Sequence, residues 1–231
     1  MKKKHIVKKI YREETLEKLQ AKLNMSKNNK MDAIDFMNIR IVTTLIIFIL
    51  VLLYSRIGYF LAPFISFAYY LLLEYIVIDI PLANRGRMLD HEALYFFEIL
   101  TLTLESGRNL EKSLQVTVDN VHSELSDEFK KTLNEMNYGK SLIEALDDMK
   151  KRIPSESINN IILNMTQTSI FGSSILETLY SQVDFLRDKQ SLEIKGQINK
   201  IPNKISIVSV LFVVPLILIL ILGPFLLTYI S

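Results

Sequence analysis

The sequence predicts an all-α integral membrane protein with a cytoplasmic six-helix bundle and three transmembrane helices. The first indication is the uneven distribution of its 27 basic and 25 acidic residues, of which only three lie within 41–80 and none within 205–230. Such long, nearly uncharged stretches are typical of membrane-spanning segments. The second indication is the lack of strand-like alternation between 85 and 204. The third is a short glycine-containing pattern that occurs three times in this region and is typical of turns between helices.

The charge pattern divides the chain into four expected segments. They are a basic cytoplasmic N-terminal segment at 1–35, a hairpin of two transmembrane helices at 36–80, a cytoplasmic six-helix domain at 85–200, and a C-terminal transmembrane helix at 205–230. The roughly 120 residues between the apolar blocks are enough for one hydrophobic core but not for two. We therefore expect a single bundle on the cytoplasmic side.

The N-terminal segment is basic and partly amphipathic. Residues 1–40 hold 11 lysines and arginines against 5 acidic residues, and apolar side chains such as Leu16, Leu19 and Leu23 can share one side of a helix. Such a helix can lie on anionic headgroups or contact a partner protein, or the segment can serve only as cytoplasmic positive charge. The sequence leaves these three interpretations open.

The hairpin is predicted from two apolar segments that flank a turn at 55–58. Arg40, near the start of the first segment, is expected to extend its charged head to the membrane interface. Glu74 lies about one turn from the inner end of the second segment. It either reaches the headgroups or is a functional carboxylate within the membrane.

The third transmembrane helix is predicted from the uncharged block at 205–230. At 1.5 Å per residue this block is about 39 Å long, enough to cross a hydrocarbon core of about 30 Å. Pro215 and Pro224 are expected to kink or weaken it, because proline removes a backbone hydrogen bond.

The membrane orientation follows from the basic residues at the helix ends. Arg85 and Arg87 follow the second membrane segment, whereas Lys200 and Lys204 precede the third. Lysine and arginine near membrane ends mark the cytoplasmic side. We therefore expect a multi-pass protein of the cytoplasmic membrane, with the N-terminus and the 81–204 domain inside the cell and the C-terminus outside.

The repeated pattern reads Gly, any residue, Asn or Ser, Leu or Ile, two residues, a small residue, then Leu. Its turn residues are Gly107, Asn109, Gly139, Ser141, Gly172 and Ser174. Glycine tolerates the left-handed conformation that ends a helix, and Asn or Ser two positions later can cap the next helix. Three such turns predict six helices, at about 88–106, 109–122, 124–137, 141–152, 155–170 and 174–200. A period near 33 residues also occurs in helical solenoids, but the bulky consensus residues of those arrays are missing, which favours a compact bundle.

Sequence motifs for enzyme chemistry are lacking. The chain has no cysteine, and its three histidines, at positions 5, 91 and 122, do not have metal-ligand spacing. Gly139-Lys140-Ser141 resembles the end of a phosphate-binding loop, but position 134 is Asn instead of Gly. A net charge of +2 does not indicate nucleic-acid binding. We expect a protein that is not an enzyme, with no cofactor, no metal and no nucleic-acid partner.

The order of these parts resembles the F-domain family of type II secretion and type IV filament systems, and is most similar to the TadC/TadB-type platform proteins of tight-adherence pili. The elements that carry the resemblance are the turn at 139–146, Lys151-Arg152-Ile153-Pro154, the segment 171–179, Lys200 to Ile205, Val214-Pro215 and Gly223-Pro224. Many family members carry a Gly-Glu pair shortly before the third turn, whereas this chain has Gln167 to Phe171 without a carboxylate. This difference favours the tight-adherence branch.

The resemblance implies an inner-membrane platform subunit that couples a cytoplasmic secretion ATPase to pilin movement. The implied partners are that ATPase, a second F-domain protein or further copies of this chain, pilin subunits and the lipid bilayer. Candidate contacts for the ATPase are the charges at helix ends, which we expect to be exposed: Lys140, Lys150, Lys151 and Arg152. The alternative is a membrane-anchored helical adaptor or sensor that binds an unrelated cytoplasmic partner.

Overall fold

The computed structural model describes residues 13–26, 31–54, 58–171 and 174–230, with part of the last range described by its backbone alone. Every regular element in these ranges is a helix, which confirms the all-α fold class. The chain divides into two compact units, Met1–Val183 and Asp184–Ser231, and we describe each by itself.

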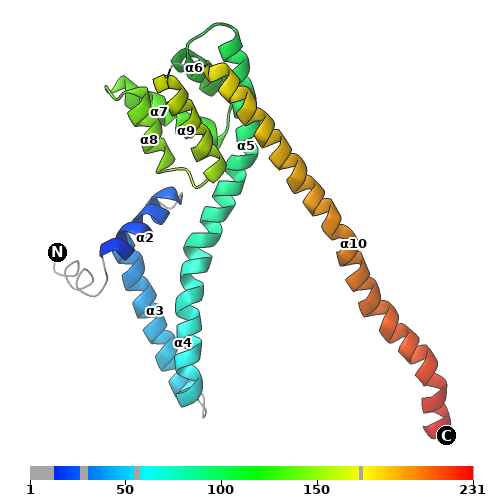
Figure 1. The fold of residues 1–231 in the computed structure, drawn as a ribbon. Coiled ribbons are helices and arrows are strands. Elements are labelled where there is room, and N and C mark those ends of the chain that lie inside the picture. The colour runs from blue at the N-terminus through cyan, green and yellow to red at the C-terminus, as the bar shows by residue number, and fades with distance from the viewer. Residues whose placement is uncertain (1–12, 27–30, 55–57, 172–173, 231) are drawn as a thin grey trace. The chain divides into compact units, whose positions relative to one another are not determined.

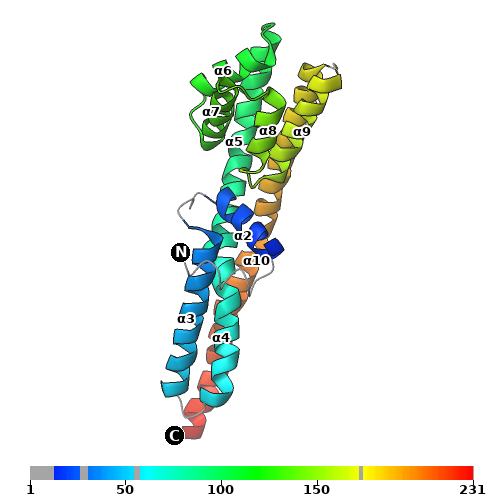
Figure 2. The same cartoon turned by 90° about the vertical axis from the view of Figure 1, so that its left-hand side faces the viewer.

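The membrane hairpin consists of α3 (Ala33–Tyr54) and α4 (Gly58–Glu74), which lie side by side (Figures 1 and 2). Two helical stretches, Ala33–Tyr54 and Gly58–Glu105, are long and apolar enough to cross a membrane. Many of their large apolar side chains face outward, as lipid contact requires; Leu53 and Phe60 are both about four-fifths exposed. These two candidate spans lie where the sequence predicted a transmembrane hairpin, and its bounds of 36–80 remain a prediction.

The second membrane helix does not end where the sequence suggested. α4 continues through a five-residue π-helix, η1 (Tyr75–Asp79), directly into α5 (Ile80–Glu105), so one helical rod leads from the hairpin into the bundle (Figure 1). We had expected a separate helix from about residue 88. In a regular α-helix the ring of Pro81 would clash with the carbonyl of Val77, and the wider π turn lies at this position. A π turn thus lets the helix continue past the proline instead of ending.

The bundle contains the six helices predicted from the turns, although the first begins earlier than expected and the last continues beyond residue 200. After α5 they are α6 (Leu110–Asn120), α7 (Glu124–Asn137), α8 (Leu142–Lys150), α9 (Glu156–Phe171) and the beginning of α10 (Ile175–Ile230). Its core includes a cluster of three buried rings, with Phe96 stacked on Phe129 at 4.5 Å and Phe97 edge-on to both. Aromatic pairs in these geometries add to the stabilisation from apolar burial.

The bundle core continues over the neighbouring helices. Leu114, Leu146 and Leu179 are at most 1% exposed. On the part of α10 that belongs to the first unit, Leu179 and Val183 are buried and lie one helical turn apart.

The turns have the local geometry that their residues favour. Gly107 has a φ of 82° and Gly139 a φ of 100°, both in the left-handed region. The Asn109 side chain accepts a hydrogen bond from the backbone of Lys112, and Ser141 forms a capping box with Glu144 at the start of α8. At the third turn, Ser174 accepts a bond from the backbone N–H of Glu177, while Gly172 lies outside the described residues.

Two substitutions in the second turn are expected to destabilise the bundle. Ser141→Ala removes the cap of α8 and should lower the unfolding free energy by about 0.5–2 kcal/mol. Gly139→Val places a β-branched residue at positive φ, which costs about 1–2 kcal/mol, although open space surrounds the position. Reversible urea unfolding of the full chain in detergent, followed by circular dichroism, measures both effects. Wild-type stability of Gly139→Val would show that its φ does not matter.

The amphipathic N-terminal helix packs on protein. In α2 (Glu13–Met25), three buried leucines pack in a cluster with residues at the start of α3 and in η1. The cluster consists of Leu16, Leu19, Leu23, Ala33, Phe36, Met37 and Ile78, with Leu73 packed against it. The apolar face of α2 is therefore covered by the chain itself and is not the face that would meet lipid.

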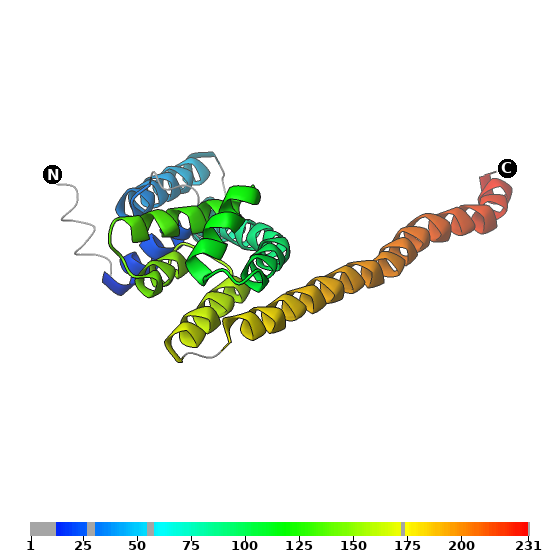
Figure 3. The ribbon, with the colours of Figure 1, turned by 90° about the horizontal axis from the view of Figure 1, so that it is seen from above.

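The second unit is the long C-terminal part of α10, from Asp184 onward, and Figure 3 shows α10 as a single helix in yellow to red. The helix continues through Pro215 and Pro224, so kinks at these prolines remain a prediction. The Pro224 side chain lies outside the described residues. Large apolar side chains between 210 and 218 are exposed. A third membrane crossing at 205–230 also stays a prediction, because only two candidate spans were found among the described side chains.

Candidate functional site

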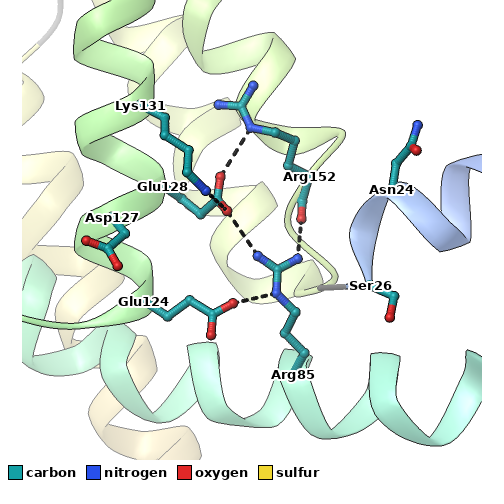
Figure 4. A pocket seen from close by; sticks show the side chains of 8 residues that line it. All are labelled: Asn24, Ser26, Arg85, Glu124, Asp127, Glu128, Lys131 and Arg152. Carbon is teal, nitrogen blue, oxygen red and sulfur yellow. Dashed lines mark hydrogen bonds and ion pairs between the residues drawn. The ribbon is translucent and has the colours of Figure 1, made fainter. Parts of the chain in front are cut away.

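A network of charged side chains lies where the helical rod enters the bundle (Figure 4). We call it the junction network. Its members are Arg85 on α5, Glu124, Glu128 and Lys131 on α7, and Arg152 after α8. Together with Asn24, Ser26 and Asp127 they line a cavity of about 210 Å³. Segments that are far apart in the sequence therefore meet at one place.

Arg85 is the centre of this network and is only 10% exposed. Its Nε donates to Glu124 at 2.6 Å, and its Nη2 donates to Glu128 at 3.1 Å. Its Nη1 donates to the carbonyl oxygen of Arg152 at 2.8 Å and also to that of Met25 at the end of α2. One guanidinium thus connects α5 with α7, the α8–α9 loop and α2, through the planar set of donors that lysine lacks.

Glu128 is the most buried acid of the network, with its side chain 6% exposed. Besides Arg85 it accepts from Lys131 at 2.9 Å and from Arg152 Nε at 3.2 Å. Arg152 also donates to Glu135 at 2.8 Å. A buried carboxylate requires such partners, because the desolvation of an unpaired charge costs several kcal/mol.

The loop between α8 and α9 contacts α5 at two further points. Gly86 faces Pro154 so closely that a side-chain Cβ at position 86 would overlap with the Pro154 carbonyl oxygen. The Ser155 hydroxyl donates to Asp90, and the same oxygen accepts from the backbone N–H of Ile158 at the start of α9. Together with the bond to Arg85, these contacts fasten the loop to the helix that comes from the membrane.

A second charged group lies at the end of the hairpin that faces the bundle. Arg40 donates to Glu74 at 2.7 Å and to the Tyr70 carbonyl at 3.0 Å, and its guanidinium lies 3.6 Å from the centre of the Tyr70 ring. Arg40 is 4% exposed, so our expectation that it extends to the interface was wrong. Lys22 on α2 lies 2.8 Å from Asp79 and 3.9 Å from Glu74. Glu74 thus joins two neighbouring helices through ion pairs.

The four predicted partner contacts differ in exposure. Lys151 and Lys140 are 75% and 44% exposed, with Lys151 paired to Asp148 and Lys140 bridging Glu135 and Asp148. Lys150 is only 26% exposed, which departs from our expectation of an exposed charge, and it pairs with Asp147. Arg152 departs from our expectation of an exposed charge, because its side chain is only 27% exposed and belongs to the junction network. Replacing it would disturb the fold, so it is unsuitable for testing a partner surface.

The lysines of α8 and its preceding turn shift the pKa values of nearby acids. Hydrogen bonds from Lys140 and then Lys151 lower the pKa of Asp148 from 3.8 to about 2. Lys140 also lowers the pKa of Glu135 by a hydrogen bond, and Asp148 in turn raises the pKa of Lys140. The pKa of Glu144 is lowered because its carboxylate accepts the backbone N–H of Ser141 in the capping box.

The Asp148 shift predicts a weak dependence of stability on acid pH. Because its pKa is lower in the folded state, the contribution is complete above about pH 4 and is lost as pH falls toward 2. In Lys140→Met the pKa of Asp148 should rise toward its ordinary value. Carboxyl titration by NMR of the full chain, with Lys112→Met as a control, measures this shift. An unchanged pKa in Lys140→Met would contradict the Lys140–Asp148 contact.

The charged groups of the junction network form structural ion pairs between helices. In the part of the chain that the structure describes, no group of three or more acidic or histidine side chains could hold a metal ion. The junction network holds arginine, lysine and glutamate side chains in mutual ion pairs. Such an arrangement can hold elements in a fixed relation and pass movement from one to another.

Sequence reasoning missed Arg85, Gly86 and Glu128 as site residues. Arg85 was used only as evidence of membrane orientation. A usable signal was the pair Glu124 and Glu128, which lie one helical turn apart on the same side of α7. Gly86 was another signal, because a glycine within a helix often marks a place where another backbone segment packs closely.

A helical bundle joined without interruption to a hairpin of membrane-spanning length is the architecture of a membrane-anchored scaffold or platform protein. The family model described as "Type II secretion system (T2SS), protein F" matches residues 96–223, which is more than half of the chain. The chain therefore belongs to this family of secretion and pilus platform proteins, which work in the inner membrane with secretion ATPases and other platform components. The search of curated proteins gave no match, and neither did the search of solved structures.

Proposed function

We propose that the chain is a non-enzymatic inner-membrane platform subunit of a tight-adherence-type pilus assembly machine. In this role a secretion ATPase moves the cytoplasmic bundle, and the membrane helices pass that movement to pilin subunits. A second F-domain protein or further copies of this chain complete the platform, since the chain matches the family over one segment, residues 96–223.

The observation that supports coupling is the uninterrupted rod from Gly58 to Glu105. Its upper part lies within the bundle, and its lower part is one leg of the hairpin (Figure 2). Arg85, Gly86 and Asp90 on this rod hold the α8–α9 loop, and Arg85 also holds α7 and α2. A force applied to α7 or α8 would therefore reach the membrane helix through short, directional contacts.

The proposed topology places the N-terminus and the 81–204 domain in the cytoplasm and the C-terminus outside. Because the chain has no cysteine, single cysteines can report the side of the membrane. Tyr59→Cys should react with an impermeant maleimide on intact cells, whereas Arg108→Cys should react only after permeabilisation. External labelling at position 108 would reject this topology.

The ATPase contact is tested best at Lys150 and Lys151 at the end of α8, of which Lys151 is exposed and Lys150 is partly buried. Lys150→Glu/Lys151→Glu reverses two charges without touching Arg152, so the junction network stays intact. We expect weaker capture of the secretion ATPase encoded nearby and less pilus assembly, with the largest difference at low salt, because exposed charges act mainly on association rate.

The charge-matched control is Arg108→Glu/Lys130→Glu, which changes exposed residues elsewhere on the bundle. It should bind the ATPase like the wild type, and circular dichroism should show that both variants are folded. Equal binding by the two double variants would reject the α8 surface. Failure of the wild-type chain to bind the ATPase would favour the adaptor or sensor interpretation.

A further inference from the structure

Two cavities follow one another along the groove between α3 and α4. The first, of about 440 Å³, lies between α2 and the cytoplasmic end of the hairpin. The second, of about 350 Å³, is lined by Ile41, Thr44, Leu45, Phe48, Ser66 and Tyr70. Tyr70 lines both cavities. The groove therefore continues from the inner membrane boundary toward the middle of the membrane.

The first cavity is cationic where it meets α2. Lys18 and Lys22 lie one turn apart on this helix, and both line the cavity. Lys18 is 73% exposed and pairs with Glu14 on its own helix, an exposed pair of small energetic value. It can therefore turn toward another anion at low cost.

The remaining charges of the first cavity largely neutralise one another. Arg40 and Glu74 form a close ion pair, and Lys22 lies between Asp79 and Glu74. The cavity thus suits a ligand with one negative charge near Lys18 and Lys22. A ligand with a positive group would have to compete with Arg40 for Glu74.

The second cavity is almost entirely apolar and opens outward between the membrane helices. Three of its six lining residues, Thr44, Ser66 and Tyr70, carry a hydroxyl group, but almost all of the surface that faces the cavity is carbon. The side chains around it face outward from the hairpin, so an occupant would share this surface with the bilayer. A hydrocarbon chain fits these walls, whereas a soluble ligand does not.

We propose that this groove binds one anionic phospholipid, with its phosphodiester at Lys18 and Lys22 and an acyl chain along Leu45, Phe48 and Tyr70. The order of the two cavities matches the order of a phospholipid's parts. The first, charged cavity lies at the membrane boundary, where the headgroup would be, and the second, apolar cavity lies deeper, where an acyl chain would be. Bound there, the lipid would join α2 to the hairpin beside η1. The proposal depends on membrane location and not on ATPase coupling.

Native mass spectrometry of the full chain released from detergent tests this site, with added phosphatidylglycerol or phosphatidylcholine of equal chain length. We expect tighter binding of phosphatidylglycerol, and an approximately fivefold loss of that binding in Lys18→Gln, as expected for one lysine at an anionic surface. Thr44→Trp, which fills the apolar groove, should weaken both lipids. The matched controls, Lys112→Gln and Leu53→Trp, should bind like the wild type.

Three results would overturn the proposal. Equal binding of both lipids would show that the lysines do not select charge. Displacement of the lipid by millimolar glycerol phosphate would indicate a site for a soluble phosphate. If Thr44→Trp still bound phosphatidylglycerol but no longer captured an apolar single-span peptide, the groove would be a site for a transmembrane helix.

Discussion

Replacing Glu128 with alanine is expected to lower the free energy of unfolding by about 3–5 kcal/mol, because removal of one partner leaves buried charges without compensation. Glu128 accepts from Arg85, Arg152 and Lys131, and its side chain is 6% exposed. Alanine favours the helical conformation, so the loss would not arise from the propensity of α7 itself. Urea unfolding of the full chain in detergent, followed by circular dichroism, measures the difference.

The neighbouring residue Asp127 provides a matched control. It lies one position before Glu128 and lines the same cavity, but its side chain is exposed. Asp127→Asn should change stability by no more than about 1 kcal/mol, since it loses only a favourable position near a helix N-terminus. If Glu128→Ala were as stable as Asp127→Asn, the junction network would not stabilise the packing of α7 and the α8–α9 loop against α5.

Much of the bundle could be predicted because its signals are local. Gly139 and Ser141 are two positions apart, and together they determine how one helix ends and the next begins. The hydrogen bonds of these turns span three to five residues. Such interactions can be inferred from short spacing alone.

The junction network could not be predicted in this way, because its partners are distant in sequence. Arg85 and Glu128 are 43 positions apart, and Arg85 and Arg152 are separated by 67. Their contact depends on how α7 and the α8–α9 loop pack against α5. The Arg40–Glu74 pair is an intermediate case, because the hairpin predicted from the sequence places both residues at similar depth, and opposite charges in two apolar helices suggest pairing.

The continuous rod also changes how the bundle is understood. A break after the second membrane helix would leave a hinge between membrane and cytoplasm. Instead, η1 carries the helix past Pro81, and α2 contacts the rod on both sides of that proline, through Lys22 to Asp79 and through the Met25 carbonyl to Arg85. The π turn is therefore supported from outside at the point where its own hydrogen bonding is least regular.

Gly86→Ala is expected to destabilise the chain by about 1–3 kcal/mol, the usual effect of overpacking. The added methyl group would overlap with the Pro154 carbonyl, which is backbone and cannot rotate away. The loop would have to move from α5, and its bonds to Arg85 and Asp90 would lengthen with it.

The same substitution at Gly196 should instead raise the free energy of unfolding. Gly196 lies within α10 and has open space around it, so alanine gains up to about 1 kcal/mol of helix propensity there without a clash. Thermal and urea unfolding of the two variants in the same detergent measures how one added methyl group changes the free energy of unfolding in each helix. If both variants were equally stable, α5 would not pack closely on the loop. Destabilisation of Gly86→Ala alone would show that this contact joins the rod to the bundle.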